Sequence, residues 1–313
     1  MSNDENDLET EALRQKLTAW LASQRPGSGA LEISGLKRSA SGFSNETQFL
    51  TMRERPAAGG EATEERLVLR LPPRRWQVFP EYDLERQVKV MRCLAATDLP
   101  VPRVIGFESD PGVLGGPFYL MGQLEGASPQ EVPPYHSFGM CSSASEEQRA
   151  RMWWGCLEIL DRVHRLDWKR LGLGFLGTAR DGAEALDHHL TYYRDYLDWV
   201  DPDHRQDILR KALGWLADHR PRPKRLTLCW GDCRLPNLLY QDFKVTGVLD
   251  WEMAHLGDPE SDLAWLLFMD WFHSEGHGIP RLKGFPGRDE TEERYQQLSG
   301  QRVENLAFHE VLA

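Results

Sequence analysis

The chain has 313 residues, of which 41% are hydrophobic and 27% charged, and its formal net charge is −11. This composition is typical of a globular protein, and the length allows one large domain or two moderate ones. The negative charge disfavours a nucleic-acid partner, because binding to a phosphate backbone draws its affinity from Lys and Arg. The longest uncharged apolar run, 263–269, is too short to span a membrane, and the acidic N-terminus does not resemble a signal peptide. We therefore expect a cytoplasmic protein without a nucleic-acid partner or a membrane span; its oligomeric state is not predicted.

The cysteines are scattered and odd in number, which favours reduced thiols over a disulfide framework. Cys229 and Cys233 are close in sequence, but no second pair of Cys or His stands at the spacing of a structural zinc site. The sequence therefore predicts neither disulfides nor zinc.

The first part of the chain changes from helical to alternating hydrophobic patterns and back. Apolar residues at helical spacing predict helices, and short alternating segments separated by Gly-rich turns predict an antiparallel sheet. The expected elements are a helix over 8–21, an antiparallel meander over 31–71, a helix over 81–96, and two strands within 100–109 and 115–126.

The second part is predominantly helical. Residues 127–146 are rich in Pro and Ser and predict a loop, and one short strand pair is expected around a turn at 241–244. The predicted boundary between the two parts lies near residue 124. The expected long helices cover 146–166, 185–200 and 204–220.

One motif has the residue types that phosphoryl transfer requires. Asp232 and Asn237 share one loop, and Asp250 follows thirteen residues after Asn237, at the end of the next hairpin strand. An Asp can accept the proton of an attacking hydroxyl, while an Asn and a second Asp can hold Mg²⁺ on the phosphates. Asp and Asn also cap ordinary turns, so the spacing alone leaves that interpretation open.

The segment 227–268, TLCWGDCRLPNLLYQDFKVTGVLDWEMAHLGDPESDLAWLLF, resembles the catalytic block of the aminoglycoside phosphotransferase/choline kinase family. The segment 84–126 resembles the same family, particularly its branch associated with acyl-CoA dehydrogenases. This resemblance covers about residues 30–312. It implies an α+β, bilobal protein-kinase-like fold, with a small antiparallel-sheet N-lobe over 1–124 and a larger, mainly helical C-lobe over 125–313. The C-lobe is expected to be truncated at its C-terminus.

The resemblance also implies roles for individual residues. Asp232 would be the catalytic base, and Asn237 and Asp250 would bind Mg²⁺. Asp258 and Asp262 would support the catalytic loop, although both could also be surface helix caps.

The implied cofactors are ATP and Mg²⁺. Arg70 would bind the nucleotide phosphates, for which a guanidinium offers a permanent charge and two parallel donors. The other implied nucleotide-binding residues are Ser41, Gly42, Phe43 and Ser44 in a turn that covers the phosphates, and Met121 and Gln123 in a hinge at 121–124 that receives adenine.

The sequence departs from the family pattern at three places. Trp230 stands where the family usually has His before the Gly-Asp pair, and its indole N–H needs an acceptor if it is buried. Gln87 stands where a Glu normally pairs with the phosphate-binding cation. Glu85 is two positions away, about 200° around the helix, and cannot replace it. The chain ends at Ala313, where the family normally continues.

The function that these residues favour is an ATP- and Mg-dependent phosphotransferase acting on a hydroxyl of a small molecule. The branch resemblance implies a hydroxyacyl thioester as the acceptor, whereas the acidic segment 187–207 would suit a cationic aminoglycoside or a choline-like amine. A kinase-like pseudoenzyme that binds nucleotide or a partner without turnover is the main alternative. A hydrolase has little support, because no G-x-S-x-G motif is present.

Overall fold

The computed structural model describes residues 3–25, 28–39, 45–57, 59–73 and 77–313. The chain divides into two units, of which the first comprises Met1–Arg92 and Pro102–Gln123 and the second Cys93–Val101 and Leu124–Ala313. The predicted boundary near residue 124 assigns 93–101 to the first part. The structure groups this segment with the second unit, because the Pro100 carbonyl accepts a hydrogen bond from Val248 N (2.8 Å) and Asp98 forms an ion pair with Arg162 (3.2 Å).

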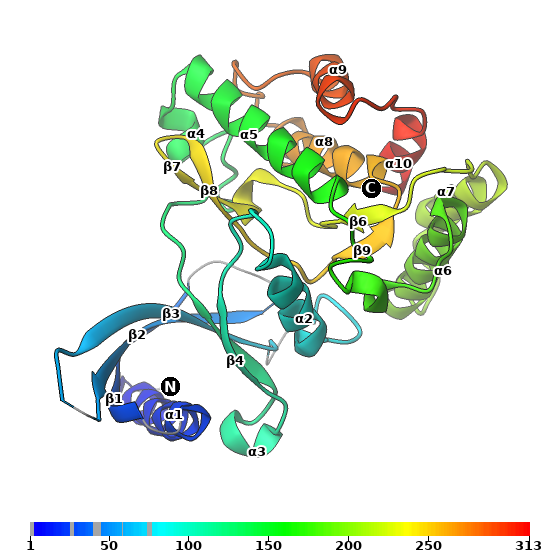
Figure 1. The fold of residues 1–313 in the computed structure, drawn as a ribbon. Coiled ribbons are helices and arrows are strands. Elements are labelled where there is room, and N and C mark those ends of the chain that lie inside the picture. Colours follow the sequence, from blue (N-terminus) through cyan, green and yellow to red (C-terminus); the bar gives the residue numbers. More distant parts are fainter. Residues whose placement is uncertain (1–2, 26–27, 40–44, 58, 74–76) are drawn as a thin grey trace. The chain divides into compact units, whose positions relative to one another are not determined.

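The first unit is built on a five-stranded antiparallel sheet with the strand order β1-β2-β3-β5-β4. Its first three strands are consecutive hairpin neighbours, so the predicted meander is confirmed (Figure 1). The strands are β1 (Ser28–Arg38), β2 (Glu46–Pro56), β3 (Thr63–Leu71), β4 (Val104–Glu108) and β5 (Phe118–Gly122).

Helix α1 (Asn3–Gln24) lies along this sheet and supplies one side of the core of the first unit (Figure 1). Trp20 packs edge-on against Phe118, with ring centroids 4.8 Å apart, and its indole donates to Glu108 Oε2 at 2.8 Å. Gly106 of β4 permits this approach, because a Cβ there would lie 2.7 Å from the indole. The short helix α3 (Pro111–Leu114) connects β4 and β5.

Helix α2 (Leu84–Leu94) lies within the predicted range 81–96. Leu84, Val88, Met91 and Leu94 are buried, as their spacing predicts. Glu85 is exposed and pairs with Lys89 one turn later, at 2.8 Å.

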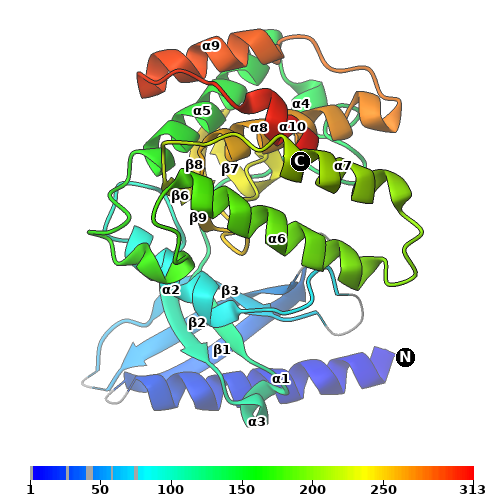
Figure 2. The same cartoon turned by 90° about the vertical axis from the view of Figure 1, so that its right-hand side faces the viewer.

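The second unit is predominantly helical, as predicted. Figure 2 shows α6 and α7 side by side. Helices α9 and α10 follow later in the chain. The helices of this unit are α4 (Met140–Ser143), α5 (Glu146–His164), α6 (Gly182–Val200), α7 (Asp207–Asp218), α8 (Glu260–Phe272), α9 (Arg288–Ser299) and α10 (Leu306–Leu312), with the 3₁₀ turns η1 (Leu173–Leu176), η2 (Leu235–Asn237) and η3 (Glu275–His277).

Two short antiparallel strand pairs interrupt these helices, rather than the one pair that was expected. β7 (Leu238–Gln241) and β8 (Lys244–Val248) form the predicted hairpin. β6 (Thr227–Cys229) instead pairs with β9 (His255–Gly257). Three residues are too few to show a strand period, so β9 could not be predicted from its hydrophobic pattern.

Helix α10 covers part of the second unit. Phe308 forms a buried cluster with Leu186 of α6 and Leu216 of α7, against which Leu312 packs. Asn305 precedes α10, but its side chain does not cap the helix and instead donates to Asp258 Oδ2 at 3.1 Å. In the part of the chain that the structure describes, no helix is long and apolar enough to cross a membrane. The predicted α+β class is confirmed, with an antiparallel sheet in the first unit and mainly helices in the second.

Candidate active site

The loop 231–237 connects β6 to β7 and begins with a glycine that no other residue could easily replace. Gly231 has φ +88°, in the left-handed region, and a Cβ there would collide with the Met253 carbonyl. The backbone N–H of Gly231 donates to Asp262 Oδ1 at 2.8 Å. This tight turn sets the position of the next residue, Asp232.

Asp232 is 5% exposed and accepts three side-chain hydrogen bonds. Asn237 Nδ2 (2.7 Å) and Arg234 Nε (3.0 Å) donate to its Oδ2, and Trp265 Nε1 donates to its Oδ1 at 2.9 Å. A carboxylate has about four acceptor positions. One position on Oδ1 is therefore left for a further donor.

The electrostatic surroundings of Asp232 suit proton transfer near neutral pH. Burial, together with the nearby carboxylates of Asp250 and Glu252, raises the pKa of Asp232 to about 7, although the hydrogen bonds from Trp265 and Asn237 act in the opposite direction. A general base works best when its pKa lies near the working pH.

Asn237 and Asp250 are joined through the backbone of the hairpin. The Asn237 carbonyl accepts a hydrogen bond from Leu249 N at 2.9 Å, one residue before Asp250. The Asn237 amide points its Nδ2 at the Asp232 carbonyl (3.0 Å) and carboxylate, so its Oδ1 is left as a possible ligand atom. Asp250 has φ +58°, an uncommon conformation for a residue other than Gly and one that recurs at functional sites. Carboxylate and amide oxygens are the ligands that Mg²⁺ accepts, so this donor set fits the implied metal.

Trp230, the first departure from the family pattern, is fully buried with its donor satisfied. Its indole Nε1 donates to the carbonyl oxygens of Leu249 (2.9 Å) and Asp250 (3.0 Å). The indole therefore holds the backbone on which Asp250 stands.

Asp262 of α8 contacts the start of the loop directly. Its Oδ2 accepts from Trp230 N at 2.7 Å and from His164 Nε2 at 2.9 Å, while Tyr295 donates its hydroxyl to the other ring nitrogen of His164 at 2.7 Å. Burial alone would raise the pKa of Asp262, but the hydrogen bonds from His164 and from Gly231 N lower it below its usual value.

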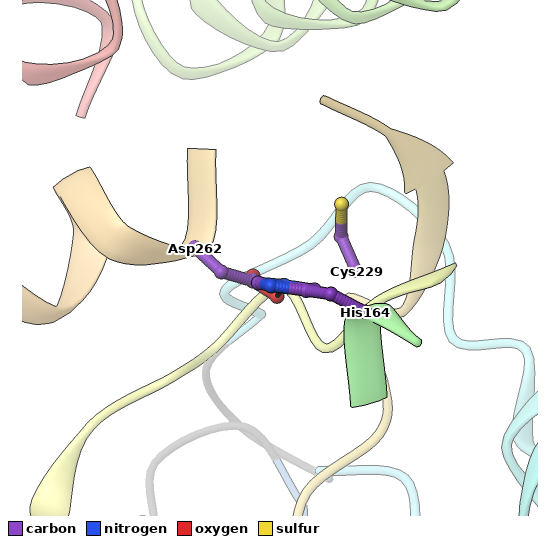
Figure 3. A group of neighbouring side chains, drawn as sticks. All are labelled: His164, Cys229 and Asp262. Atoms are coloured by element: carbon purple, nitrogen blue, oxygen red, sulfur yellow. Dashed lines mark hydrogen bonds and ion pairs between the residues drawn. The ribbon is translucent and has the colours of Figure 1, made fainter. Parts of the chain in front are cut away.

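His164, Asp262 and Cys229 come close enough together to suggest a metal site. Their possible ligand atoms lie within 4.8 Å of one another. Figure 3 shows the sulfur of Cys229 directed away from the His164–Asp262 pair. That pair is already bonded to the backbone of the loop, so we interpret the group as structural support rather than as a metal site.

Asp258 is predicted to support the catalytic loop, but its carboxylate forms hydrogen bonds elsewhere. Its carboxylate accepts from Glu260 N (3.3 Å), Asn305 Nδ2 (3.1 Å) and His309 Nε2 (3.1 Å). Among the residues that the structure describes, its side chain therefore bonds to the beginnings of α8 and α10, because it stands where β9 leads into α8.

The implied nucleotide-binding residues of the first unit lie on the sheet. Arg70 of β3 is half-buried, donates to Thr47 Oγ1 at 3.1 Å and stands opposite Tyr119 of β5. The Tyr119 hydroxyl donates to Gln87 Oε1 at 3.1 Å. Met121 is buried on β5, and Gln123 N donates to the Arg66 carbonyl at 2.9 Å. The predicted phosphate turn, Ser41, Gly42, Phe43 and Ser44, lies outside the described residues.

Sequence reasoning missed three side chains that surround the predicted base. Arg234 lies inside the motif, between Asp232 and Asn237, so its position in the sequence could have indicated a role at the site. Trp265 is 33 residues from Asp232, and Glu131 lies in the segment expected to be a loop. Neither carries a local pattern that could indicate its role.

Comparisons with known proteins identify the family and the fold of the chain. The model of the phosphotransferase enzyme family matches residues 35–298. Acyl-CoA dehydrogenase family member 10 of Mus musculus is 28% identical over 252 residues, which cover 80% of this chain but 21% of that protein. The chain thus spans about a fifth of the length of this relative.

Solved structures show the same fold. A candidate aminoglycoside phosphotransferase from Ralstonia eutropha JMP134 is 23% identical, with a TM-score of 0.67 over 94% of this chain and 84% of that one. The GDP complex of an aminoglycoside 2′-phosphotransferase is 13% identical, with a TM-score of 0.58 over 95% and 86%. The match of the family model to most of the chain, together with the motif of Asp232, Asn237 and Asp250, shows that this chain belongs to the phosphotransferase enzyme family.

Proposed function

We propose that the chain transfers the γ-phosphoryl group of ATP to a hydroxyl of a small molecule, with Asp232 as the base. The observation that carries this proposal is the state of Asp232, which is buried and has its pKa raised to about 7 beside Asp250. An isolated turn-capping Asp would have neither property. Its three donors fix the carboxylate in one orientation, as a base requires.

The hydrogen bonds indicate which oxygen accepts the proton. Oδ2 already accepts from Asn237 and Arg234, whereas Oδ1 accepts from Trp265 alone among the described side chains. The acceptor hydroxyl would donate to Oδ1. As its oxygen bonds to the γ-phosphorus and the bond from phosphorus to the bridging oxygen of ADP breaks, the hydroxyl proton passes to Asp232.

Asn237 Oδ1 and the Asp250 carboxylate would hold Mg²⁺. The ion would neutralise charge on the β- and γ-phosphates when bound. Asp250 and Glu252 both raise the pKa of Asp232, so this region is strongly negative and suited to a divalent cation.

Residues of the first unit would bind the nucleotide. Arg70 would contact the phosphates, and the backbone near Met121 and Gln123 would contact the base. One structural neighbour was solved as its GDP complex, which supports a nucleotide ligand for this fold. ATP remains our proposal for this chain.

Ion pairs offset part of the negative charge on α6 and α7. Arg210 pairs with Asp198 (2.6 Å) and Asp201 (3.5 Å), and Arg220 pairs with Asp187 (3.1 Å). These pairs weaken the attraction of this surface for a polycationic acceptor such as an aminoglycoside.

Aromatic side chains accompany the base instead. Trp265 bonds to Asp232 and begins a series of ring contacts along α8 through Phe268 to Trp271, with centroids 5.8 and 5.9 Å apart. On α6, Tyr193 is close enough to Asp232 for the carboxylate to raise its pKa, although burial is the larger cause. These surroundings favour an acceptor with an apolar body, and we propose a hydroxyacyl thioester.

Two substitutions test the assignment of roles. Asp232→Asn should lower kcat by about 10²–10⁴, the contribution of a positioned general base, and leave Mg·ATP binding nearly unchanged. Asp250→Asn should abolish Mg·ATP binding and turnover together. Turnover is measured with Mg·ATP and a panel of hydroxyacyl-CoA thioesters, aminoglycosides and choline-like amines, and binding is measured by calorimetry.

Asp289→Asn is the matched control, because the Asp289 side chain is 98% exposed. It should behave as the unchanged protein. Equal loss of nucleotide affinity in Asp232→Asn and Asp250→Asn would show that the roles are misassigned. Binding of Mg·ATP without transfer to any acceptor or to water would instead favour the pseudoenzyme.

A further inference from the structure

The segment 127–139, expected to be a featureless loop, is fixed to the end of α8 by a buried carboxylate. Asp270 accepts from the Tyr135 hydroxyl at 2.7 Å and from His136 Nε2 at 2.9 Å on one oxygen, and from Arg281 Nε at 2.6 Å on the other. Both Tyr135 and His136 are buried. The backbone that carries Glu131, four residues before Tyr135, is therefore anchored.

Glu131 forms an ion pair with Arg234 Nη1, and both side chains are largely buried, at 16% and 20% exposure. Arg234 uses a different nitrogen, Nε, to reach Asp232 Oδ2 at 3.0 Å. One planar guanidinium thus joins the carboxylate of Glu131 to that of Asp232. Buried ion pairs are poor evidence for stability, since the cost of desolvation offsets their attraction, so a role in orientation is the better explanation.

We propose that Arg234 is a positioning residue for Asp232 and that Glu131 holds Arg234 in place, so that turnover depends on the anchored segment 127–139. This inference rests on the proposed function, because it takes Asp232 as the base. The planar fork of Arg fits the arrangement, since two of its nitrogens donate in fixed directions. Without Glu131 the guanidinium can turn, and Asp232 Oδ2 then loses one of its two donors.

The main test is a double-mutant cycle with Glu131→Gln and Arg234→Met, in which Mg·ATP hydrolysis with water as the acceptor is measured. Each single change should lower kcat about 10- to 100-fold, because small misplacements of a reacting group have effects of that size. The KM for Mg·ATP should stay within about twofold. The double variant should be no slower than Arg234→Met alone, because Glu131 acts through Arg234.

The pair Arg288 and Glu310 offers a matched control. It is a two-point ion pair at 2.6 and 3.0 Å between α9 and α10. Glu310→Gln and Arg288→Met should leave kcat unchanged. Arg234→Lys, which keeps the charge but not the fork, should recover part of the rate that Arg234→Met loses.

Three kinetic outcomes would overturn the proposal. In the first, the losses of kcat in the two single variants multiply in the double variant. In the second, Glu131→Gln changes the KM for Mg·ATP and leaves kcat unchanged. In the third, the variants of the control pair lose as much kcat as those of Glu131 and Arg234. Melting temperatures of all variants identify any that fail to fold.

A spectroscopic measurement separates this inference from the proposed function. The Nε–H resonance of Arg234, identified by its absence in Arg234→Lys, should shift in both Glu131→Gln and Asp232→Asn. This measurement needs no turnover. If the unchanged protein hydrolyses no ATP, the proposed function fails and the NMR spectra still report the ion pair; if Glu131→Gln leaves the resonance unmoved, the inference fails whatever the activity.

Discussion

Trp230 stands where the family usually has His, and its indole holds the backbone of the neighbouring hairpin. Its single N–H reaches two carbonyl oxygens, those of Leu249 and Asp250, at 2.9 and 3.0 Å. Asp250 itself is held in a left-handed backbone conformation, which costs of the order of 1–3 kcal/mol and persists only when its surroundings enforce it. The indole is one of the groups that enforce it.

Trp230→Phe should therefore affect both stability and metal-dependent binding. Loss of the donor leaves two buried carbonyls without this partner, which costs about 1–3 kcal/mol of unfolding free energy. Relaxation of Asp250 should raise the KM for Mg·ATP. Denaturant unfolding and steady-state kinetics measure the two effects.

Trp153→Phe is the control for this substitution, because Trp153 is another fully buried tryptophan whose indole makes one bond, to Thr291 Oγ1 at 2.9 Å. It should lower stability without changing KM. A normal KM for Mg·ATP in Trp230→Phe would mean that the backbone of Asp250 is held by other contacts.

At the scale of elements, the sequence predicted those with a long or regular pattern. The meander of β1, β2 and β3 and the helices α2, α5, α6 and α7 were recognisable from hydrophobic period, and the β7–β8 hairpin from its turn. β9 was missed because it has three residues, and α8 because its apolar residues run almost without interruption over 263–269.

The motif residues Asp232, Asn237 and Asp250 were predicted because their spacing is local. The groups that orient them were not predicted. Trp265 lies 33 residues beyond Asp232, and Glu131 lies about 100 residues before Arg234, so neither contact leaves a trace in local spacing. Burial, which raises the pKa of Asp232, likewise depends on packing that no short motif encodes.

At the scale of the whole molecule, buried ionisable groups are distributed unevenly. Among the described residues, the buried polar side chains of the first unit are the neutral Asn45, Gln48 and Gln87. Those of the second unit include, in addition to Asp232, the ionisable residues His136, Arg149, Asp161, His164, Asp201, Asp258, Glu260, Asp262, Asp270, His273 and His309. The change in folding stability at acidic pH should therefore arise mainly from groups in the second unit.

His273 and His189 should both contribute to the first part of that response. His273 is 5% exposed, and neither ring nitrogen has a hydrogen-bond partner among the described residues. Burial, followed by the charge of Arg234, lowers the pKa of His273 from 6.5 to about 4. Between these values the unfolded chain binds the proton and the folded chain does not, so stability should fall as the pH decreases from about 6.5 to 4, by up to about 3 kcal/mol.

His273→Phe should flatten this part of the pH profile. Urea unfolding at constant ionic strength between pH 4 and 7 measures the slope. Part of the slope should remain, because burial also lowers the pKa of His189. At still lower pH, stability should be lost through protonation of Asp258, Asp262 and Asp270. The pKa values of these carboxyls lie below normal despite burial, because donors such as His309, His164 and His136 favour the charged forms. An unchanged slope in His273→Phe would assign the effect to other groups.

The cysteines share this uneven distribution, since all five lie in the second unit. Four are buried, and burial raises the pKa of Cys141 to about 12 and the pKa values of Cys229 and Cys233 well above normal, while Cys93 is partly accessible. Alkylating reagents attack thiolates, so they should modify Cys93 first and the other four only when the second unit opens. Counting alkylated thiols by mass spectrometry at increasing urea would then follow the opening of the unit that contains Asp232, without any substrate. Rapid alkylation of all five thiols in native buffer would contradict this expectation.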